Sequence, residues 1–193
     1  MLSSKESLKV LRKTNALLEG HFVLSSGLHS DRYIQCAKLL SYPKLAKNLC
    51  TSLVEKINRS FKNIDIILSP ALGGLIIGYE VARLMEIQNI FAERESGKLV
   101  LRRGFKIKEK SNVLIVEDVI TTGKSAKECS EIVIRNKANL LGYACIIDRS
   151  NNNSLIKDNI VSQVAINIKT FKENEIPEEL KKIQPLKPGS RSL

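Results

Sequence analysis

The sequence lacks several features that mark whole classes of protein. It has no tryptophan, only 5% aromatic residues and two histidines among 193 residues. So few aromatics argue against a base-stacking surface for single-stranded nucleic acid. His21 and His29 are too isolated to indicate a metal cluster or a Ser/His/Asp arrangement. No apolar run approaches membrane-spanning length, and the first six residues lack the apolar core of a signal peptide.

The four cysteines do not form a recognisable framework. Cys36, Cys50, Cys129 and Cys145 include no CxxC pair and no metal-ligand spacing. Cys129 and Cys145 lie within apolar patterns, so we expect them to be buried thiols. Together with the absence of a targeting segment, this cysteine usage predicts a protein of the reducing cytoplasm, with no membrane partner.

The chain has an ordinary globular composition and an excess of positive charge. Hydrophobic residues make up 43% and charged residues 26% of the sequence, and the net charge is +11. A chain of this length can bury a full core, and we expect a single domain over residues 1–193. The charge favours anionic partners such as phosphorylated small molecules. Because the basic residues are spread along the chain, we expect no nucleic-acid binding.

Apolar strands and amphipathic helices alternate through the middle of the chain. We expect strands at residues 64–68, 89–92, 113–116, 140–147 and 164–168, and helices at 73–85 and 125–136. Strands that are apolar along their whole length predict an α/β fold with a parallel sheet covered by helices on both faces. Ligands bind at the carboxyl ends of such strands, where polar pairs stand at residues 69–70, 93–94, 117–118 and 148–149.

The segments outside this alternation have distinct patterns. Residues 5–18 predict a helix ending at Gly20, residues 21–40 a hairpin-like unit, and residues 43–57 a second helix. We treat about residues 1–40 as a hood. The basic stretch at about 94–110 predicts a flap or β-arm over the site. The tail at about 177–193 holds one short helical pattern followed by prolines, and we expect it to be frayed.

Residues 113–125 are the most informative stretch. A buried strand leads to Glu117 and Asp118, and a hydroxyl- and glycine-rich turn precedes a helix. Free N–H groups and the helix dipole make such a turn an anion site, most naturally for a phosphate. Paired carboxylates suit ribose hydroxyls or Mg²⁺. This combination predicts a nucleotide-like ligand.

Two other phosphate motifs fail on spacing. A Walker A loop ending at Gly123 would need a second glycine at the position of Asp118. The turn at residues 70–74 lacks both the spacing and the acidic partner of a dinucleotide-binding GxGxxG motif.

Residues 113–125 resemble the phosphoribosyl pyrophosphate signature of type I phosphoribosyltransferases: a hydrophobic strand, two acids, two further residues, then Thr-Thr-Gly. Residues 20–33, 93–95, 101–105 and 148–150 resemble one bacterial branch of the orotate phosphoribosyltransferases. The resemblance runs from the first helix to Ser150 and fades over the tail. It implies a parallel sheet flanked by helices, with a small N-terminal hood and a β-arm.

The resemblance also implies an activity. The phosphoribosyl group would pass from phosphoribosyl pyrophosphate to orotate, giving orotidine 5′-monophosphate and pyrophosphate in pyrimidine synthesis. Mg²⁺ would be required, bound mainly through the substrate with no assigned protein ligand. The enzyme would be a homodimer in which the basic flap of one subunit reaches the partner's site.

Site residues follow from the same resemblance. The residues that would bind phosphoribosyl pyrophosphate are Glu117, Asp118, Val119, Ile120, Thr121, Thr122, Gly123, Lys124 and Ser125. Those of the pyrophosphate loop and flap are Ala71, Leu72, Gly73, Gly74, Arg94, Lys98, Arg102 and Arg103. Thr121 and Arg149 would contact orotate, Arg149 by pairing its planar guanidinium with the carboxylate. Arg94, Lys98 and Asp118 are the expected catalytic residues.

The sequence departs from the family pattern at the flap. Many members have adjacent Arg-Lys with a downstream Lys and His, whereas here Glu95 follows Arg94 and Lys98 is the lysine nearby. Many also have a lysine where Ser25 stands. Two alternatives stay open: a purine phosphoribosyltransferase, which shares the phosphoribosyl pyrophosphate turn, and a regulator that uses the turn as a ligand sensor.

Overall fold

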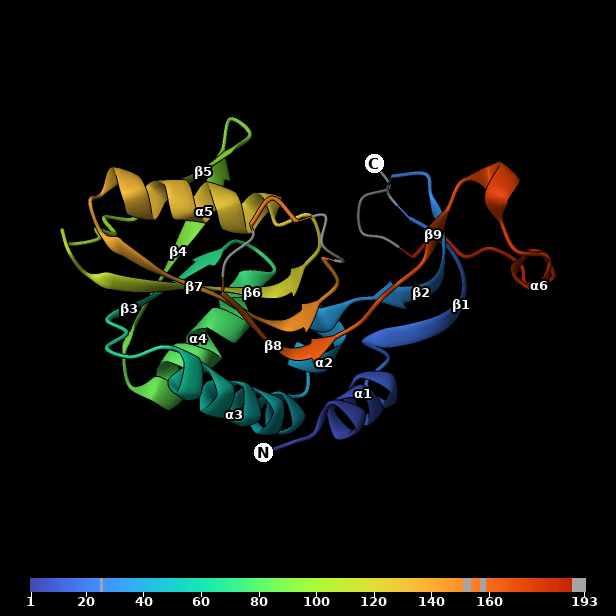
Figure 1. The fold of residues 1–193 in the computed structure, drawn as a ribbon, viewed down its shortest axis with the longest axis horizontal. Helices are drawn as coiled ribbons and strands as arrows, with labels where there is room; N and C mark the ends of the chain where they lie inside the picture. The colour runs from blue at the N-terminus through green and yellow to red at the C-terminus, as the bar shows by residue number, and fades with distance from the viewer. Residues whose placement is uncertain (25, 151–153, 157–158, 189–193) are drawn as a thin grey trace.

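A computed structural model describes residues 1–24, 26–150, 154–156 and 159–188 (Figure 1). The larger of its two sheets has six strands in the order β5-β4-β3-β6-β7-β8. These strands are β3 (Ile66–Pro70), β4 (Gln88–Glu95), β5 (Lys98–Leu101), β6 (Asn112–Ile120), β7 (Asn139–Asp148) and β8 (Ile160–Ala165). All neighbours pair in parallel except β4 and β5, which pair antiparallel. The predicted α/β fold with a mainly parallel sheet is confirmed.

Helices cover both faces of this sheet, as the apolar strands predicted. Helices α3 (Pro43–Ser60) and α4 (Gly74–Met85) lie on one face, and α5 (Lys124–Arg135) lies on the other (Figure 1). Alternate residues of β6 enter the two cores: Leu114 packs with the α3 and α4 side, and Ile115 with the α5 side. Because successive strand residues point to opposite faces, a strand buried on both sides must be apolar throughout.

The β4–β5 hairpin forms the first part of the β-arm predicted at about residues 94–110, and its strands end at Leu101. Arg94 lies directly opposite Leu99, and the turn between the strands contains Ser96 and Gly97, both with positive φ. Leu99 is 2% exposed and belongs to the α5-side core, whereas Lys98 beside it is exposed. The alternation of buried and exposed residues explains the weak period-two pattern in the sequence.

The smaller sheet, here called the hood sheet, has the order β1-β2-β9. Its strands are β1 (Leu17–Val23), β2 (His29–Ile34) and β9 (Thr170–Phe171), and α1 (Ser4–Lys13) and α2 (Cys36–Leu40) flank the hairpin in the chain. The predicted helix over residues 5–18 is wrong beyond Lys13. Asn15 adopts a left-handed φ of 55°, and Leu17 then pairs with Ile34, so Gly20 lies within a strand.

The C-terminal segment packs on the hood sheet. After the 3-10 turn η1 (Glu173–Glu175) and α6 (Glu178–Lys181), Leu186 forms a bridge with Phe22. The Leu186 N–H donates to the His21 carbonyl, and the Val23 N–H donates to the Leu186 carbonyl, both at 2.8 Å. The expectation of a frayed tail is therefore wrong for residues 177–188, because they include helix α6 and Leu186, whose backbone bonds to the edge of β1. Residues 189–193 lie outside the described part, as does Ser25.

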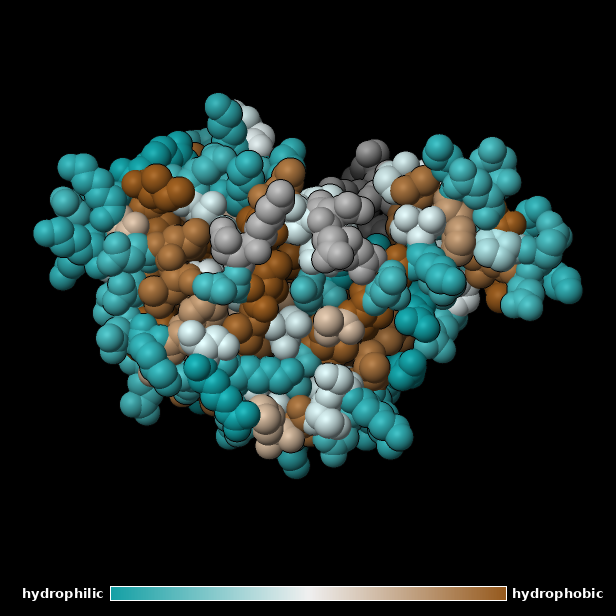
Figure 2. Space-filling view, in the orientation of Figure 1, coloured by the Kyte–Doolittle hydropathy of each residue, from teal (hydrophilic) through white to brown (hydrophobic). Residues whose placement is uncertain are grey.

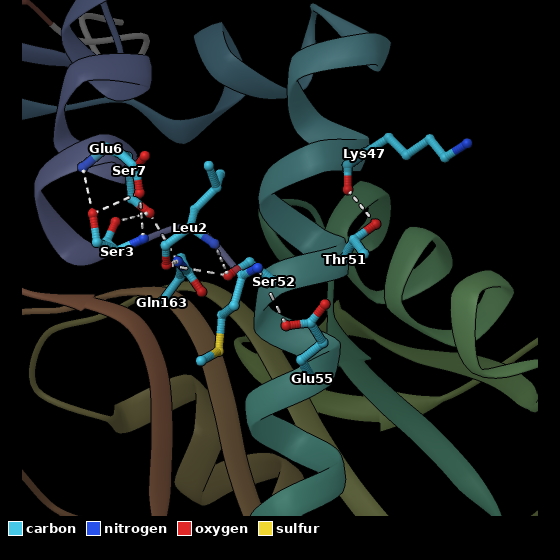
Figure 3. Close-up of polar contacts among 10 residues, drawn as sticks. Leu2, Ser3, Glu6, Ser7, Lys47, Thr51, Ser52, Glu55 and Gln163 are labelled. Carbon is cyan, nitrogen blue, oxygen red and sulfur yellow. Dashed lines mark hydrogen bonds and ion pairs between the residues drawn. The ribbon is translucent and has the colours of Figure 1, made fainter.

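The N-terminal segment joins α1 to the main sheet (Figure 3). The Leu2 N–H donates to Ser52 Oγ on α3 at 2.9 Å. The side-chain amide of Gln163 on β8 donates to the Leu2 carbonyl at 3.1 Å and to Ser7 Oγ at 2.8 Å. The first helix of the hood is thus tied to both a helix and a strand of the main domain.

Several strand boundaries differ from prediction; among them, β4 extends three residues beyond residue 92, as far as Glu95. Strand β6 continues four residues beyond Val116, because it pairs with β7 as far as Ile120 opposite Asp148. The last strand begins at Ile160, four residues early, because it pairs with β7 from Tyr143 onward. Strand β3 is shifted by two residues. In each case pairing with a neighbouring strand sets the limits.

In the space-filling view, hydrophobic residues gather over the middle of this face and hydrophilic residues over its two outer ends (Figure 2). The carboxyl ends of β6 and β7 point toward the hood sheet (Figure 1). In the part of the chain that is described, no helix combines the length and apolar character needed to cross a bilayer.

Candidate active site

The predicted phosphate turn joins β6 to α5. Gly123 is the N-cap residue of α5, with φ of 71°, and Lys127 N–H donates to its carbonyl at 2.8 Å. The Leu155 N–H donates to the Thr122 carbonyl at 2.8 Å and braces the turn from outside. Thr121, Thr122 and Lys124 are exposed. The turn therefore presents hydroxyls and a helix N-terminus to solvent, which is the arrangement that binds phosphate.

Gly123 is required at this turn for two reasons. Its positive φ is one that residues with a Cβ rarely adopt. A Cβ would also lie 2.6 Å from Ser154 Oγ and 2.9 Å from Ile156 Cγ1. Ile120, at the end of β6, is 1% exposed and packs in the core, so its side chain supports the turn from below.

The acid pair Glu117 and Asp118 lies inside strand β6, which corrects the expectation that the acids follow the strand. Consecutive strand residues point to opposite faces, so the two carboxylates diverge. Glu117 faces α5, where its charge influences Cys129. Asp118 faces the loop before α4: a Cβ added at Gly73 would lie 2.7 Å from its Oδ1. The pair thus flanks the carboxyl edge of the sheet from both sides.

Both carboxyl groups have raised pKa values. Burial, and then the charge of Asp118, raises the pKa of Glu117 to about 8, and the positive charge of Arg94 opposes the rise. Burial raises the pKa of Asp118, opposed by backbone hydrogen bonds from Val119 and its own N–H. Half-buried acids at the end of a strand, with pKa values raised by their surroundings, are typical of a site that receives a cation or hydroxyl groups.

The loop that follows β3 comes close to the acid pair. The Ala71 N–H donates to the Ala92 carbonyl at 2.8 Å, and the peptide between Ala71 and Leu72 is cis. Leu72 is 83% exposed. Gly74 packs so closely that a Cβ would lie 3.0 Å from the Val116 carbonyl oxygen. The structure therefore brings the predicted pyrophosphate loop against the predicted ribose site.

Among the predicted cations, Arg94 acts on one member of the acid pair, because its charge lowers the pKa of Glu117. Its guanidinium forms a bidentate ion pair with Glu128 on α5, with Nη1–Oε2 at 3.0 Å and Nη2–Oε1 at 3.2 Å. Nη1 also donates to the Gly97 carbonyl at 2.7 Å. Sequence reasoning missed Glu128, since an acid inside a helix carries no motif.

The other predicted cations differ in their partners. Arg103 forms a bidentate pair with Glu93 at 2.8 and 2.9 Å, an acid whose role the sequence did not indicate. Arg102 Nε lies 3.6 Å from Glu95 Oε1. Within the described residues, the exposed Lys98 forms no ion pair. The structure thus leaves Lys98 available and engages the two arginines within the β-arm region.

Arg149 follows β7 and is held beside the turn, because its N–H donates to the Ile120 carbonyl at 2.9 Å. The residue is half-buried, and burial lowers the pKa of its guanidinium. The adjacent Asp148 accepts from the Ser150 N–H at 2.9 Å. Among the residues that the structure describes, the Arg149 guanidinium has neither an ion-pair nor a hydrogen-bond partner. A half-buried cation without a partner is suited to an anionic ligand.

The site offers oxygen donors for a metal ion but no complete ligand set. Within the described ranges, no group of three His, Cys, Asp or Glu residues could hold a metal. Asp118 supplies a carboxylate beside the loop at residues 71–74. Mg²⁺ is commonly bound by one or two carboxylates together with substrate phosphates and waters, and this donor set fits that mode.

A mainly parallel sheet, a glycine turn at the N-terminus of α5, two acids near the end of β6 and a glycine loop beside Asp118 form the arrangement expected of an α/β phosphoribosyl-transferring enzyme. Comparison with known proteins agrees: the phosphoribosyl transferase domain family matches residues 40–182. The chain belongs to the phosphoribosyltransferase family.

Several close relatives of this chain belong to one group within this family. Orotate phosphoribosyltransferase of Caldicellulosiruptor saccharolyticus is 44% identical over 192 residues, covering 100% of both chains. The enzyme of the same name from Caldicellulosiruptor bescii is 45% identical and covers 95% of this chain and 96% of its own. The crystal structure of orotate phosphoribosyltransferase from Aeropyrum pernix has a TM-score of 0.71 at 25% identity, covering 82% of this chain and 92% of that one. The full-length resemblance is thus to the orotate phosphoribosyltransferases.

Proposed function

We propose that the protein transfers the phosphoribosyl group from phosphoribosyl pyrophosphate to orotate, forming orotidine 5′-monophosphate and pyrophosphate in pyrimidine biosynthesis. Full-length similarity to enzymes named for this reaction supports the proposal. The observation that carries the choice of acceptor is the half-buried Arg149 guanidinium, which lacks a partner among the described residues. Orotate brings a carboxylate to it, whereas adenine and hypoxanthine do not.

The turn after β6 anchors the sugar phosphate. Backbone N–H groups and hydroxyls from Thr121 to Ser125 bind the 5′-phosphate, and Gly123 permits its close approach. Lys124 is exposed and adds a positive charge at the rim. Val119 and Ile120 hold the turn at the end of β6, since both belong to the strand. This anchoring fixes the ribose while its anomeric carbon changes partners.

The acid pair orients the ribose. Glu117 and Asp118 accept hydrogen bonds from the 2′- and 3′-hydroxyls, and their negative charge favours the positive charge that develops at C1′. Burial raises the pKa of both carboxyl groups. A cation bound beside them would lower these pKa values and so favour the ionised forms.

The leaving pyrophosphate carries most of the negative charge. The loop at residues 71–74 receives it beside Asp118, and Arg94, Lys98, Arg102 and Arg103 are the cations proposed to neutralise it. Of these, we assign catalysis to Arg94 and Lys98 together with Asp118. Mg²⁺, held mainly through the substrate, would supply further neutralisation of the diphosphate.

The acceptor lies between the phosphate turn and Arg149. The planar guanidinium pairs with the orotate carboxylate by two parallel hydrogen bonds, and Thr121 contacts the ring. The two orotate contacts, Thr121 and Arg149, directly follow β6 and β7, which are paired with each other, and the Arg149 N–H is bonded to the Ile120 carbonyl. The fixed pairing sets the distance between acceptor and sugar.

The proposed assembly is a homodimer in the cytoplasm. Leu72, Ile76 and Tyr79 are 83%, 55% and 62% exposed and lie along one side of α4 and the loop before it. An apolar strip that begins within the pyrophosphate loop would place a second copy next to the site, from where its β-arm could reach across. The four free cysteines, all buried, agree with a reducing compartment.

A direct assay tests the proposal. Loss of orotate absorbance should depend on phosphoribosyl pyrophosphate and Mg²⁺, with adenine and hypoxanthine as matched acceptors. Turnover with a purine and none with orotate would establish the purine alternative. Ligand binding without turnover of any of these bases would favour a sensor.

A further inference from the structure

Glu128 holds both strands of the β-arm at one cross-strand position. It accepts two hydrogen bonds from the Arg94 guanidinium, at 3.0 and 3.2 Å, and its Oε2 also accepts from the Leu99 N–H at 3.1 Å. Arg94 on β4 and Leu99 on β5 lie directly opposite each other. A single carboxylate therefore fastens the hairpin to α5.

The contact is stronger than an ordinary surface ion pair. It is bidentate and charge-assisted, and the same carboxylate is fixed by a backbone N–H. Although burial acts to raise the pKa of Glu128, the hydrogen bonds from Arg94 and Leu99 lower it. The Gly97 carbonyl accepts from Arg94 Nη1 at 2.7 Å and limits the guanidinium further. These partners restrict the conformations open to Arg94.

The fixed guanidinium acts on Glu117. Arg94 is bonded to Glu128, and its positive charge lowers the pKa of Glu117. Glu128 belongs to α5, the helix whose N-terminus forms the phosphate turn. Glu128 therefore links the β-arm cation to the helix that begins at the phosphate turn.

We infer that Glu128 is a positioning residue for the transfer reaction: it holds the Arg94 guanidinium in one place and keeps the β-arm attached to α5, the helix that begins at the proposed phosphate turn. The inference rests on the proposed function, in which Arg94 neutralises the leaving pyrophosphate. Glu128 itself touches no substrate and acts through Arg94.

Glu128→Gln tests this, because glutamine preserves the shape and an oxygen for the Leu99 N–H but loses the charge. We expect kcat to fall by about tenfold or more, with KM for orotate changed by less than about twofold. Glu131→Gln, an exposed acid on the same helix, should behave as the unaltered protein. Glu128→Gln with unaltered kcat, or with increased kcat, would overturn the inference.

A double-mutant cycle separates positioning from a general structural effect. If Glu128 acts through Arg94, the double variant Arg94→Ala/Glu128→Gln should be no slower than Arg94→Ala alone. Independent, multiplying losses would contradict an action through Arg94.

Amide hydrogen exchange at Leu99 gives a readout independent of activity. In Glu128→Ala this amide should exchange about tenfold faster or more, and in Glu131→Ala at the original rate. Unaltered exchange at Leu99 in Glu128→Ala would refute the attachment of the β-arm. If the unaltered protein turned over no orotate, the proposed function would fail while this measurement still decided the attachment.

Discussion

Asp118 in strand β6 and Gly73 in the loop before α4 lie close together although they are far apart in the sequence: a Cβ at residue 73 would lie 2.7 Å from Asp118 Oδ1 and 3.1 Å from its Cγ. This contact joins the proposed pyrophosphate loop to the proposed ribose site. The Asp118 carboxylate can therefore keep this position only because residue 73 has no side chain.

Gly73→Ala should therefore reduce activity more than stability. Gly73 has φ of −55°, so alanine suits its backbone, but the added methyl would displace Asp118. We expect kcat/KM for phosphoribosyl pyrophosphate to fall about tenfold or more. Gly78→Ala is the contrast, since its Cβ would lie 2.9 Å from the Cβ of the buried Ser69 and should cost about 1–3 kcal/mol of stability. Equal activity of Gly73→Ala and the unaltered enzyme would remove the functional meaning of the contact.

The pKa of Glu117 makes stability depend on pH. Its pKa is about 8 in the folded protein against an ordinary value of 4.5, so folding favours the protonated form. The stabilising contribution is fully present below pH 4.5 and is lost as the pH rises through about 8. Glu117→Gln should thus raise the unfolding temperature of the ligand-free protein, and the rise should be several degrees larger at pH 9 than at pH 5. The exposed Glu131→Gln serves as control, and a pH-independent difference for Glu117→Gln would contradict the assignment.

Arg149→Ala should affect the acceptor far more than the donor. Removing the guanidinium takes away the proposed partner of the orotate carboxylate, so KM for orotate should rise about tenfold or more. KM for phosphoribosyl pyrophosphate should change by less than about twofold. Arg149→Lys keeps the charge without the planar fork and should lie between the two. Arg135→Ala, at an exposed arginine on α5, is the matched control. A comparable rise in both KM values would place Arg149 elsewhere in the site.

Lys98 and Arg102 should differ in their contributions. Lys98 is exposed and, among the described residues, forms no ion pair, whereas Arg102 lies 3.6 Å from Glu95 in an exposed pair. We expect Lys98→Ala to lower kcat about tenfold and Arg102→Ala to change it by less than about twofold, with little effect on stability from either. Steady-state kinetics at saturating substrate concentrations would measure both kcat values. A larger loss of kcat in Arg102→Ala than in Lys98→Ala would assign the catalytic role to Arg102.

Local sequence patterns predicted much of the main sheet and its helices. The continuous apolar strands, Pro43 in the first turn of α3 and the Thr-Thr-Gly turn before α5 each reflect constraints within a few residues. Cys129 and Cys145 are buried, as their apolar surroundings predicted. Prediction failed where the spacing of apolar residues was compatible with both a helix and a strand. At Leu17, the helical spacing of α1 continues into residues that form strand β1.

The sequence by itself determined the strand, the acid pair and the turn of residues 113–125, because strand burial and helix N-terminal chemistry are written in adjacent residues. Tertiary structure alone decided the rest. The contact of Asp118 with Gly73, the hold of Glu128 on Arg94 and the packing of Leu186 on β1 all join distant segments. Such contacts depend on how strands pair and which face of the sheet each helix covers, and no local periodicity records them.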